Sequence, residues 1–98
     1  MINDVYIKVR SGADKDMVRE KIRTSYQKEG KTRFIFDVTE ARVSIDDMKT
    51  LKRIFDSFEE LTRTKLEETC VILEGELKKK VIKTFLASIK KVRPVKIL

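Results

Sequence analysis

Three aspartates are the residues of this chain best placed for metal or phosphate chemistry. Asp37 ends a predicted apolar strand, and Asp46 and Asp47 begin the helix that follows it. Carboxylates at the carboxyl end of a parallel sheet could together hold a Mg²⁺ ion. The simpler interpretation, which we favour, is a strand-end aspartate plus two carboxylates at the positive end of a helix dipole. We therefore expect no metal site and no cofactor.

The residue types that the chain lacks narrow the chemistry further. Histidine, the commonest general base and metal ligand, is absent. Cys70 is the single cysteine, so one chain can form neither a disulfide nor a thiolate zinc site. Its place in a predicted buried strand favours an inert core thiol over a nucleophile. The glycines are isolated, which excludes a Gly-rich phosphate loop. We expect no catalytic residues and no enzyme.

Basic charge is concentrated in the last part of the chain. In residues 76–98 Glu76 is the one acidic residue, and this segment accounts for the whole net charge of +7. The candidate anion-binding residues are Lys78, Lys79, Lys80, Lys83, Lys90, Lys91 and Arg93. Such a segment could bind nucleic acid or another acidic surface, with an affinity that falls as salt rises. The alternative is a solvated face, because no exposed aromatic residue is available there to stack on bases.

Hydrophobic periodicity predicts alternating strands and helices. The expected strands span residues 4–10, 33–38, 68–73 and 95–98, and the first helix spans 14–28. Ser44 is the expected N-cap of a second helix that runs to about Leu61. Its apolar stripe comprises Ile45, Met48, Leu51, Ile54, Phe55, Phe58 and Leu61. The third helix has a stripe of Leu77, Val81, Ile82, Phe85, Leu86 and Ile89.

The order βαβαβαβ predicts a single α/β domain over residues 1–98, with a mostly parallel four-stranded sheet. The second and third strands are apolar on both faces, as interior strands are, whereas the first alternates and the last carries Pro94 and Lys96. This favours the sequential strand order 1-2-3-4. Right-handed crossovers in one direction then place every helix on one face. The other face would show either Ile35, Cys70 and Ile72 or the alternating set of strand side chains, as a homodimer interface or beneath a chain end.

Length and hydropathy bear on location. The chain of 98 residues suits one domain. No apolar run approaches the roughly 20 residues that span a bilayer, and residues 1–10 contain no signal-peptide core. With one thiol among apolar neighbours, these features predict a cytoplasmic protein without a membrane segment.

Residues 34–51, FIFDVTEARVSIDDMKTL, resemble the STAS domain, the family of bacterial anti-sigma-factor antagonists. Phe34 to Val38 match the family's strand ending in Asp-Leu, and Ser44 to Met48 occupy the position of its helix-opening signature. Residues 70–75 and 77–86 are similar to its later strand and helix. The resemblance implies repeated βα units and a regulatory role in docking a protein partner. Asp47 and Met48 stand where the family has a phosphorylated Ser or Thr and a Gly, so that phosphorylation has no acceptor at this position.

The sequence thus predicts a non-enzymatic, STAS-like interaction domain. The contact surface that the resemblance implies comprises Thr39, Glu40, Ser44, Asp46, Asp47 and Met48. The alternative function is binding of nucleic acid or an acidic surface through the Lys-rich final third.

Overall fold

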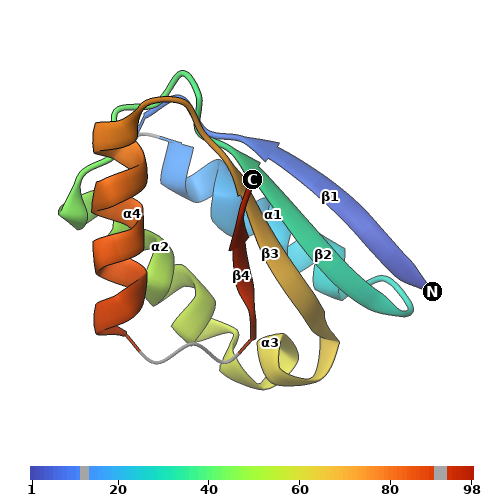
Figure 1. Cartoon of the computed structure of the whole chain (residues 1–98). Helices are drawn as coiled ribbons and strands as arrows, with labels where there is room; N and C mark the ends of the chain where they lie inside the picture. Colours follow the sequence, from blue (N-terminus) through green and yellow to red (C-terminus); the bar gives the residue numbers. More distant parts are fainter. Residues whose placement is uncertain (12–13, 90–92) are drawn as a thin grey trace.

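The computed structural model describes residues 1–11, 14–89 and 93–98, and these form an α/β fold (Figure 1). The elements in chain order are β1 (Ile2–Lys8), α1 (Lys15–Tyr26), β2 (Lys31–Asp37), α2 (Ile45–Ser57), α3 (Glu59–Lys65), β3 (Leu66–Ile72), α4 (Glu76–Ser88) and β4 (Val95–Ile97). All four strands are parallel, in the order β1-β2-β3-β4. The predicted fold class and strand order are confirmed.

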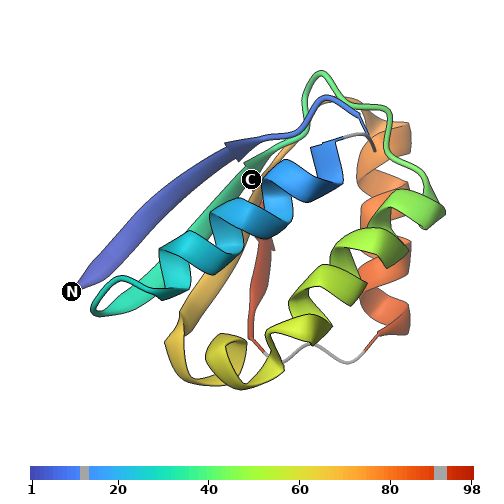
Figure 2. The same ribbon diagram turned by 180° about the vertical axis from the view of Figure 1, so that it is seen from behind.

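The helices lie on one side of the sheet. Figure 2 shows α1 (blue to cyan) crossing in front of the strands and α2 (green) crossing in front of α4 (orange), which it contacts. This is the arrangement expected when successive right-handed crossovers advance in one direction across a sheet. It places the loops that follow β1, β2 and β3 together at the carboxyl ends of the strands.

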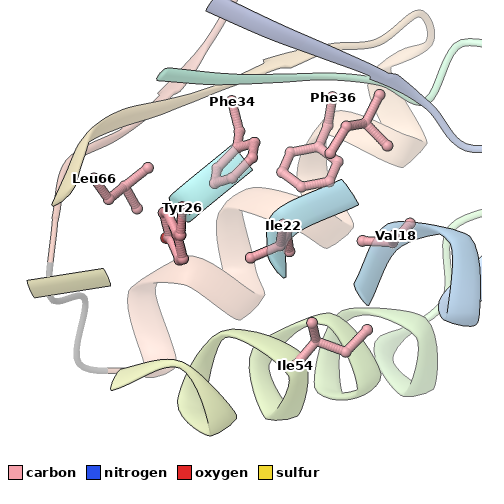
Figure 3. Close-up of a cluster of buried hydrophobic side chains, with 8 residues drawn as sticks. Val18, Ile22, Tyr26, Phe34, Phe36, Ile54 and Leu66 are labelled. Atoms are coloured by element: carbon pink, nitrogen blue, oxygen red, sulfur yellow. The ribbon is translucent and has the colours of Figure 1, made fainter. Parts of the chain in front are cut away.

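The core is built on β2. Phe34 and Phe36 are fully buried on the side that faces the helices, where they meet Ile22 and Tyr26 of α1 and Ile54 of α2 (Figure 3). The ring centroids of Tyr26 and Phe34 are 5.6 Å apart in an edge-to-face contact. Burial of each such side chain contributes roughly 1.5–3 kcal/mol, so this cluster fixes α1 and α2 on the sheet.

The second predicted helix is divided in the structure. The predicted helix to about Leu61 is wrong: α2 ends at Ser57, and α3 begins at Glu59 after Phe58, whose φ and ψ are −114° and 30°. The break turns the chain so that the Phe58 ring packs 6.1 Å from the Tyr26 ring. It also brings the Thr62 hydroxyl to 2.9 Å from the Tyr26 hydroxyl, which is buried. Tertiary contacts with α1 therefore outweigh the continuous helical pattern.

Three residues of the predicted apolar stripes are exposed. Ile45 is 41% exposed, Leu61 is 42% exposed and Leu77 is 82% exposed. Ile45 and Leu77 lie in the first turns of α2 and α4, where the chain has only just left a loop. Leu61 belongs to α3, which has a different axis from α2 because of the break at Phe58.

The predicted strand 68–73 begins earlier in the structure, at Leu66, directly after α3. Thr32 pairs with Leu66 and Arg33 pairs with Glu68, so that Glu67 is an extra residue in the register. This bulge lets both Leu66 and Thr69 turn their side chains into the core, where they are buried.

The opposite face of the sheet carries no helix among the described residues, as predicted (Figures 1 and 2). Arg33 pairs across this face with Asp4 at 3.3 Å and with Glu68 at 2.9 Å. Ile35 is only 7% exposed and Cys70 is buried as well. The apolar side chains that remain open on this face include Tyr6, which is 67% exposed, Ile2 and Leu98, and Ile72 is half-buried. In the part of the chain that the structure describes, no helix is long and apolar enough to cross a bilayer.

Candidate functional site

The loop that follows β2 starts with a tight turn around Asp37. One carboxylate oxygen of Asp37 accepts hydrogen bonds from the Thr39 backbone amide at 3.0 Å and from the Thr39 hydroxyl at 2.7 Å. These two bonds, the hydroxyl's first, hold the pKa of the Asp37 carboxyl below its usual range. Thr39, a predicted contact residue, therefore fixes the direction in which the chain leaves the sheet.

Glu40 is anchored to the end of β1. Its carboxylate accepts from the Lys8 ammonium at 3.1 Å and lies 3.7 Å from the Arg10 guanidinium. The next residue, Ala41, is buried and donates its amide to the Val38 carbonyl. The middle of the loop is thus held by ion pairs with the end of β1 and by a backbone hydrogen bond to Val38, the residue that precedes the loop.

Lys78 holds the same loop from the opposite side. Its ammonium group donates to the carbonyl oxygens of Val38 at 2.7 Å and Thr39 at 3.2 Å. Because Lys78 belongs to the first turn of α4, the loop is bonded to both sequence-distant neighbours, β1 and α4. A loop held in this way loses little conformational entropy when it binds.

Ser44 and Asp47 pair with each other at the start of α2. The Asp47 amide donates to the Ser44 hydroxyl at 3.1 Å, and the Ser44 amide donates to the Asp47 carboxylate at 3.1 Å. This reciprocal arrangement is a capping box, which satisfies two backbone donors that the helix leaves free. The sequence interpretation of Ser44 as an N-cap is confirmed.

The first turn of α2 presents its remaining side chains to solvent. Among the described residues, no hydrogen bond or ion pair engages the Asp46 carboxylate, which is exposed. Ile45 beside it is an exposed apolar side chain, and Met48 is half-buried at the edge of the core. Sequence reasoning assigned Ile45 to the core; its position directly after the N-cap was the signal that it would face outward.

The predicted site residues therefore divide into two groups. Thr39, Glu40, Ser44 and Asp47 shape the loop and the helix start, whereas Asp46, Met48 and the newly identified Ile45 form the accessible surface. We refer to the loop 39–44 with this first turn as the docking edge.

The three aspartates do not form one cluster. Asp37 bonds to Thr39 and Asp47 bonds to Ser44, and within residues 1–11, 14–89 and 93–98 no group of three metal-binding side chains comes together. Cys70 is buried, with its sulfur 3.8 Å from a Glu68 carboxylate oxygen. Burial first, and the nearby Glu68 charge second, raise the pKa of its thiol, which disfavours the reactive thiolate.

The Lys-rich segment is split by the fold. Lys78 bonds to the loop at the carboxyl ends of the strands, whereas Arg93 precedes β4 at the other end of α4 and donates to the Arg63 carbonyl of α3. Lys79, Lys80 and Lys83 remain beside a shallow groove with Leu77 and Thr84 on α4. Lys90 and Lys91 lie outside the described residues. The predicted anion-binding residues thus do not gather in one described patch.

An apolar cavity between the helices and the sheet escaped sequence reasoning. It has a volume of about 350 Å³, is half open to solvent, and is bordered by α2, α4, the start of α1 and the sheet, with charged side chains such as Lys52, Asp56 and Glu59 also on its wall. Ala41, Val43 and Met48 of the docking edge lie on its wall at one end, and Arg93 lies on its wall as well. The hydrophobic pattern of the sequence does not predict this cavity, because its size depends on the distances between the helices and the sheet.

Comparison of the chain with protein-family models, with curated proteins and with solved structures found no match. The geometry of the docking edge is therefore the basis for assigning a function.

Proposed function

We propose that this protein is a non-enzymatic interaction domain that docks a protein partner through the docking edge. The observation that carries the proposal is the way the loop 39–44 is held. Lys78 bonds it from α4, and Lys8 bonds it from β1. These bonds leave Ile45 and Asp46 as an exposed apolar and acidic pair on a rigid support. Rigid presentation of a few exposed side chains lowers the entropic cost of binding.

The chemistry of the docking edge defines the partner. Ile45 requires an apolar pocket, and Asp46 beside it requires a cationic side chain at the rim of that pocket. Met48 and Val43, both half-buried next to Ile45, offer a flexible and a compact apolar surface around the contact. The resemblance of residues 34–51 to the STAS domain supports a docking role for the same segment, and we extend the proposal to a regulatory, cytoplasmic protein.

The titratable groups of the described residues support a role without catalysis. The lowered pKa of Asp37 keeps this carboxylate ionised and a weak base, whereas a general base works best with a pKa near neutrality. The raised pKa of Cys70 keeps its thiol protonated. Both shifts follow from structural contacts and neither provides an activated group.

Site-specific photo-crosslinking tests the proposal. A photoreactive phenylalanine analogue replaces Ile45 in one variant and Leu77 in a matched control, because both residues are exposed and lie in the first turn of a helix. Irradiation in cells should give one discrete protein adduct from position 45 that position 77 does not give. Equal adducts from both positions, or none from position 45 in a folded variant, would refute docking at this edge.

A second candidate is polyanion binding on the outer face of α4. The specific observation is that Lys79, Lys80 and Lys83 border one groove and engage no ion pair among the described residues. Three cations on adjacent turns of a helix attract phosphate groups. This candidate predicts that binding depends on these lysines and is indifferent to changes at Ile45.

A further inference from the structure

The open face of the sheet carries a row of side chains that crosses all four strands. The parallel register places them side by side in the order Tyr6 on β1, Ile35 on β2, Cys70 on β3 and Lys96 on β4. Ile7, the next residue along β1, is buried against the helices, and successive side chains of a strand point to opposite faces. The row therefore runs from an aromatic ring on one edge strand, across two apolar side chains, to a cation on the other edge strand.

The two ends of this row have no partner within the described chain. Tyr6 is 67% exposed, and its hydroxyl makes no hydrogen bond to any described residue. Lys96 is exposed and forms neither an ion pair nor a hydrogen bond with residues 1–11, 14–89 or 93–98. The two side chains cannot reach each other, because β1 and β4 are the outer strands of the sheet (Figure 1) and neighbouring strands are about 4.8 Å apart. A cation and an aromatic ring attract each other at close range, so the matching group has to come from another molecule.

The row is complementary to itself. A second copy, turned by 180° about an axis parallel to the strands and midway between β2 and β3, presents the same row in reverse order. Tyr6 of each copy then faces Lys96 of the other, and Ile35 faces Cys70 in the middle. Such a two-fold contact makes every interaction twice. Two sheets that pack in this way lie about 10 Å apart, with their strands within about 30° of each other.

The charged residues of this face do not oppose the contact. The four strands contain as many basic as acidic residues, although the chain has a net charge of +7. Arg33 is paired with Asp4 at 3.3 Å and with Glu68 at 2.9 Å, and the two-fold rotation brings it opposite Glu68 of the second copy. At the carboxyl end of the sheet, Lys8 and Asp37 are bonded to the loop that follows β2. Two copies can therefore meet at this face without the repulsion that their net charges create elsewhere.

We infer that the chain forms a symmetric homodimer through the open face of its sheet, with Tyr6 of each copy against Lys96 of the other. Strands about 4.8 Å apart with a rise of about 3.3 Å per residue give a face of roughly 400 Å² on each copy. Stable interfaces of standard size bury about 800 Å² per partner, so this dimer is weak and dissociates on dilution. The docking edge lies at the end of the sheet and stays accessible in both copies.

Sedimentation equilibrium of the purified chain tests the inference. The average mass should rise from that of one chain at micromolar concentration toward that of two chains at millimolar concentration. Tyr6→Lys places a cation opposite Lys96 of the second copy and should weaken the dimer at least tenfold. Leu77→Lys is the matched control, because Leu77 is 82% exposed on α4 and its replacement adds the same charge away from the sheet. A mass that stays at one chain throughout, or equal weakening by both variants, would overturn the inference.

A charge exchange tests the contact between Tyr6 and Lys96. Lys96→Glu, added to Tyr6→Lys, should restore the dimer, because the new opposite charges face each other between the two copies. Within one chain these positions lie on opposite edges of the sheet, so a purely structural effect of Tyr6→Lys would not be rescued. Failure of the folded double variant to dimerise would contradict the proposed contact.

Crosslinking tests the direction of the two-fold axis. In a Cys70→Ala background, one chain carries Tyr6→Cys and another carries Lys96→Cys, and a bismaleimide with a span of about 10 Å joins thiols across the packed sheets. The mixture should give the adduct between the two variants, whereas each variant alone should give little. Adducts formed mainly between two copies of one variant would overturn the proposed axis. No other protein is present in these measurements, so their failure leaves the docking proposal standing, and a failure of docking leaves them unaffected.

Discussion

The Lys78 ammonium group lies 2.7 Å from the Val38 carbonyl oxygen and so joins the first turn of α4 to the loop that leads into α2. The two residues are 40 positions apart in sequence. Through this contact the Lys-rich part of the chain supports the docking edge. Lysines that are neighbours in sequence should therefore differ in their effect on the docking edge.

Replacing Lys78 by methionine should loosen the loop while keeping the aliphatic part of the side chain. Loss of the charge-assisted bonds to Val38 and Thr39 should cost about 1–3 kcal/mol of local stability. Backbone amides of residues 39–41 should then exchange hydrogen roughly tenfold faster or more in deuterium-exchange mass spectrometry. Lys80→Met is the control, because Lys80 is exposed. Equal protection in both variants would show that Lys78 does not hold the loop.

The buried Tyr26 hydroxyl should make stability fall at alkaline pH. Desolvation raises the pKa of Tyr26 to about 12, while the hydrogen bond with Thr62 opposes the shift. The unfolded chain ionises this phenol near pH 10, so it loses its proton first. The contribution of the neutral Tyr26 phenol to folding stability is therefore fully present below pH 10 and is lost as pH rises from about 10 to 12. In urea denaturation across this pH range, the free energy of unfolding should decline less steeply for Tyr26→Phe than for the wild type.

Replacing the exposed Tyr6 by phenylalanine provides the control for that experiment, because this change removes the same phenol from a solvated position. Tyr6→Phe should leave the alkaline decline unchanged. If both variants alter it equally, the effect belongs to the unfolded chain and not to burial of Tyr26.

The capping box should stabilise the start of α2. Ser44→Ala removes the side-chain acceptor of the Asp47 amide and should lower the free energy of unfolding by about 1 kcal/mol. Asp47→Ala should cost a similar amount, and the double variant should cost clearly less than the sum, because either change breaks the same reciprocal pair. Chemical denaturation of the four proteins measures this. Strict additivity would mean that the two residues act independently.

Nucleic-acid binding, if it occurs, should use few contacts. Lys79, Lys80 and Lys83 share one groove, while Lys78 and Arg93 are bonded to backbone carbonyls. About three phosphate contacts predict a slope near −3 in a plot of log affinity against log salt. Fluorescence anisotropy of short labelled DNA and RNA measures it. Micromolar binding at physiological salt with a much steeper slope would favour the Lys-rich segment as the main site.

The strand order could be predicted from sequence because interior and edge strands differ in their residue types. The first strand alternates and the last carries Pro94 and Lys96, whereas Phe34 to Phe36 and Cys70 to Ile72 are apolar on both faces. Those differences distinguish edge strands from interior strands. The N-cap at Ser44 could be predicted for a similar reason, since a cap is a local interaction.

The features that sequence reasoning missed depend on contacts between distant segments. The break at Phe58 exists because Phe58 and Thr62 reach Tyr26, and no local pattern reports that contact. Lys78 looks like any solvated lysine until the loop after β2 is placed beside it. The cavity depends on the distance between α4 and the sheet, which the apolar stripe of α4 does not determine.

We propose above all that Ile45 and Asp46 contact a protein partner. The most direct test is the calorimetric affinity of the crosslinked partner, once purified, for the wild type, Ile45→Glu, Asp46→Lys and Lys80→Glu. Both docking-edge variants should weaken binding at least tenfold with an unchanged melting temperature, and Lys80→Glu should bind as the wild type does. An affinity that survives both docking-edge changes and is lost in Lys80→Glu would contradict the account and assign binding to the outer face of α4.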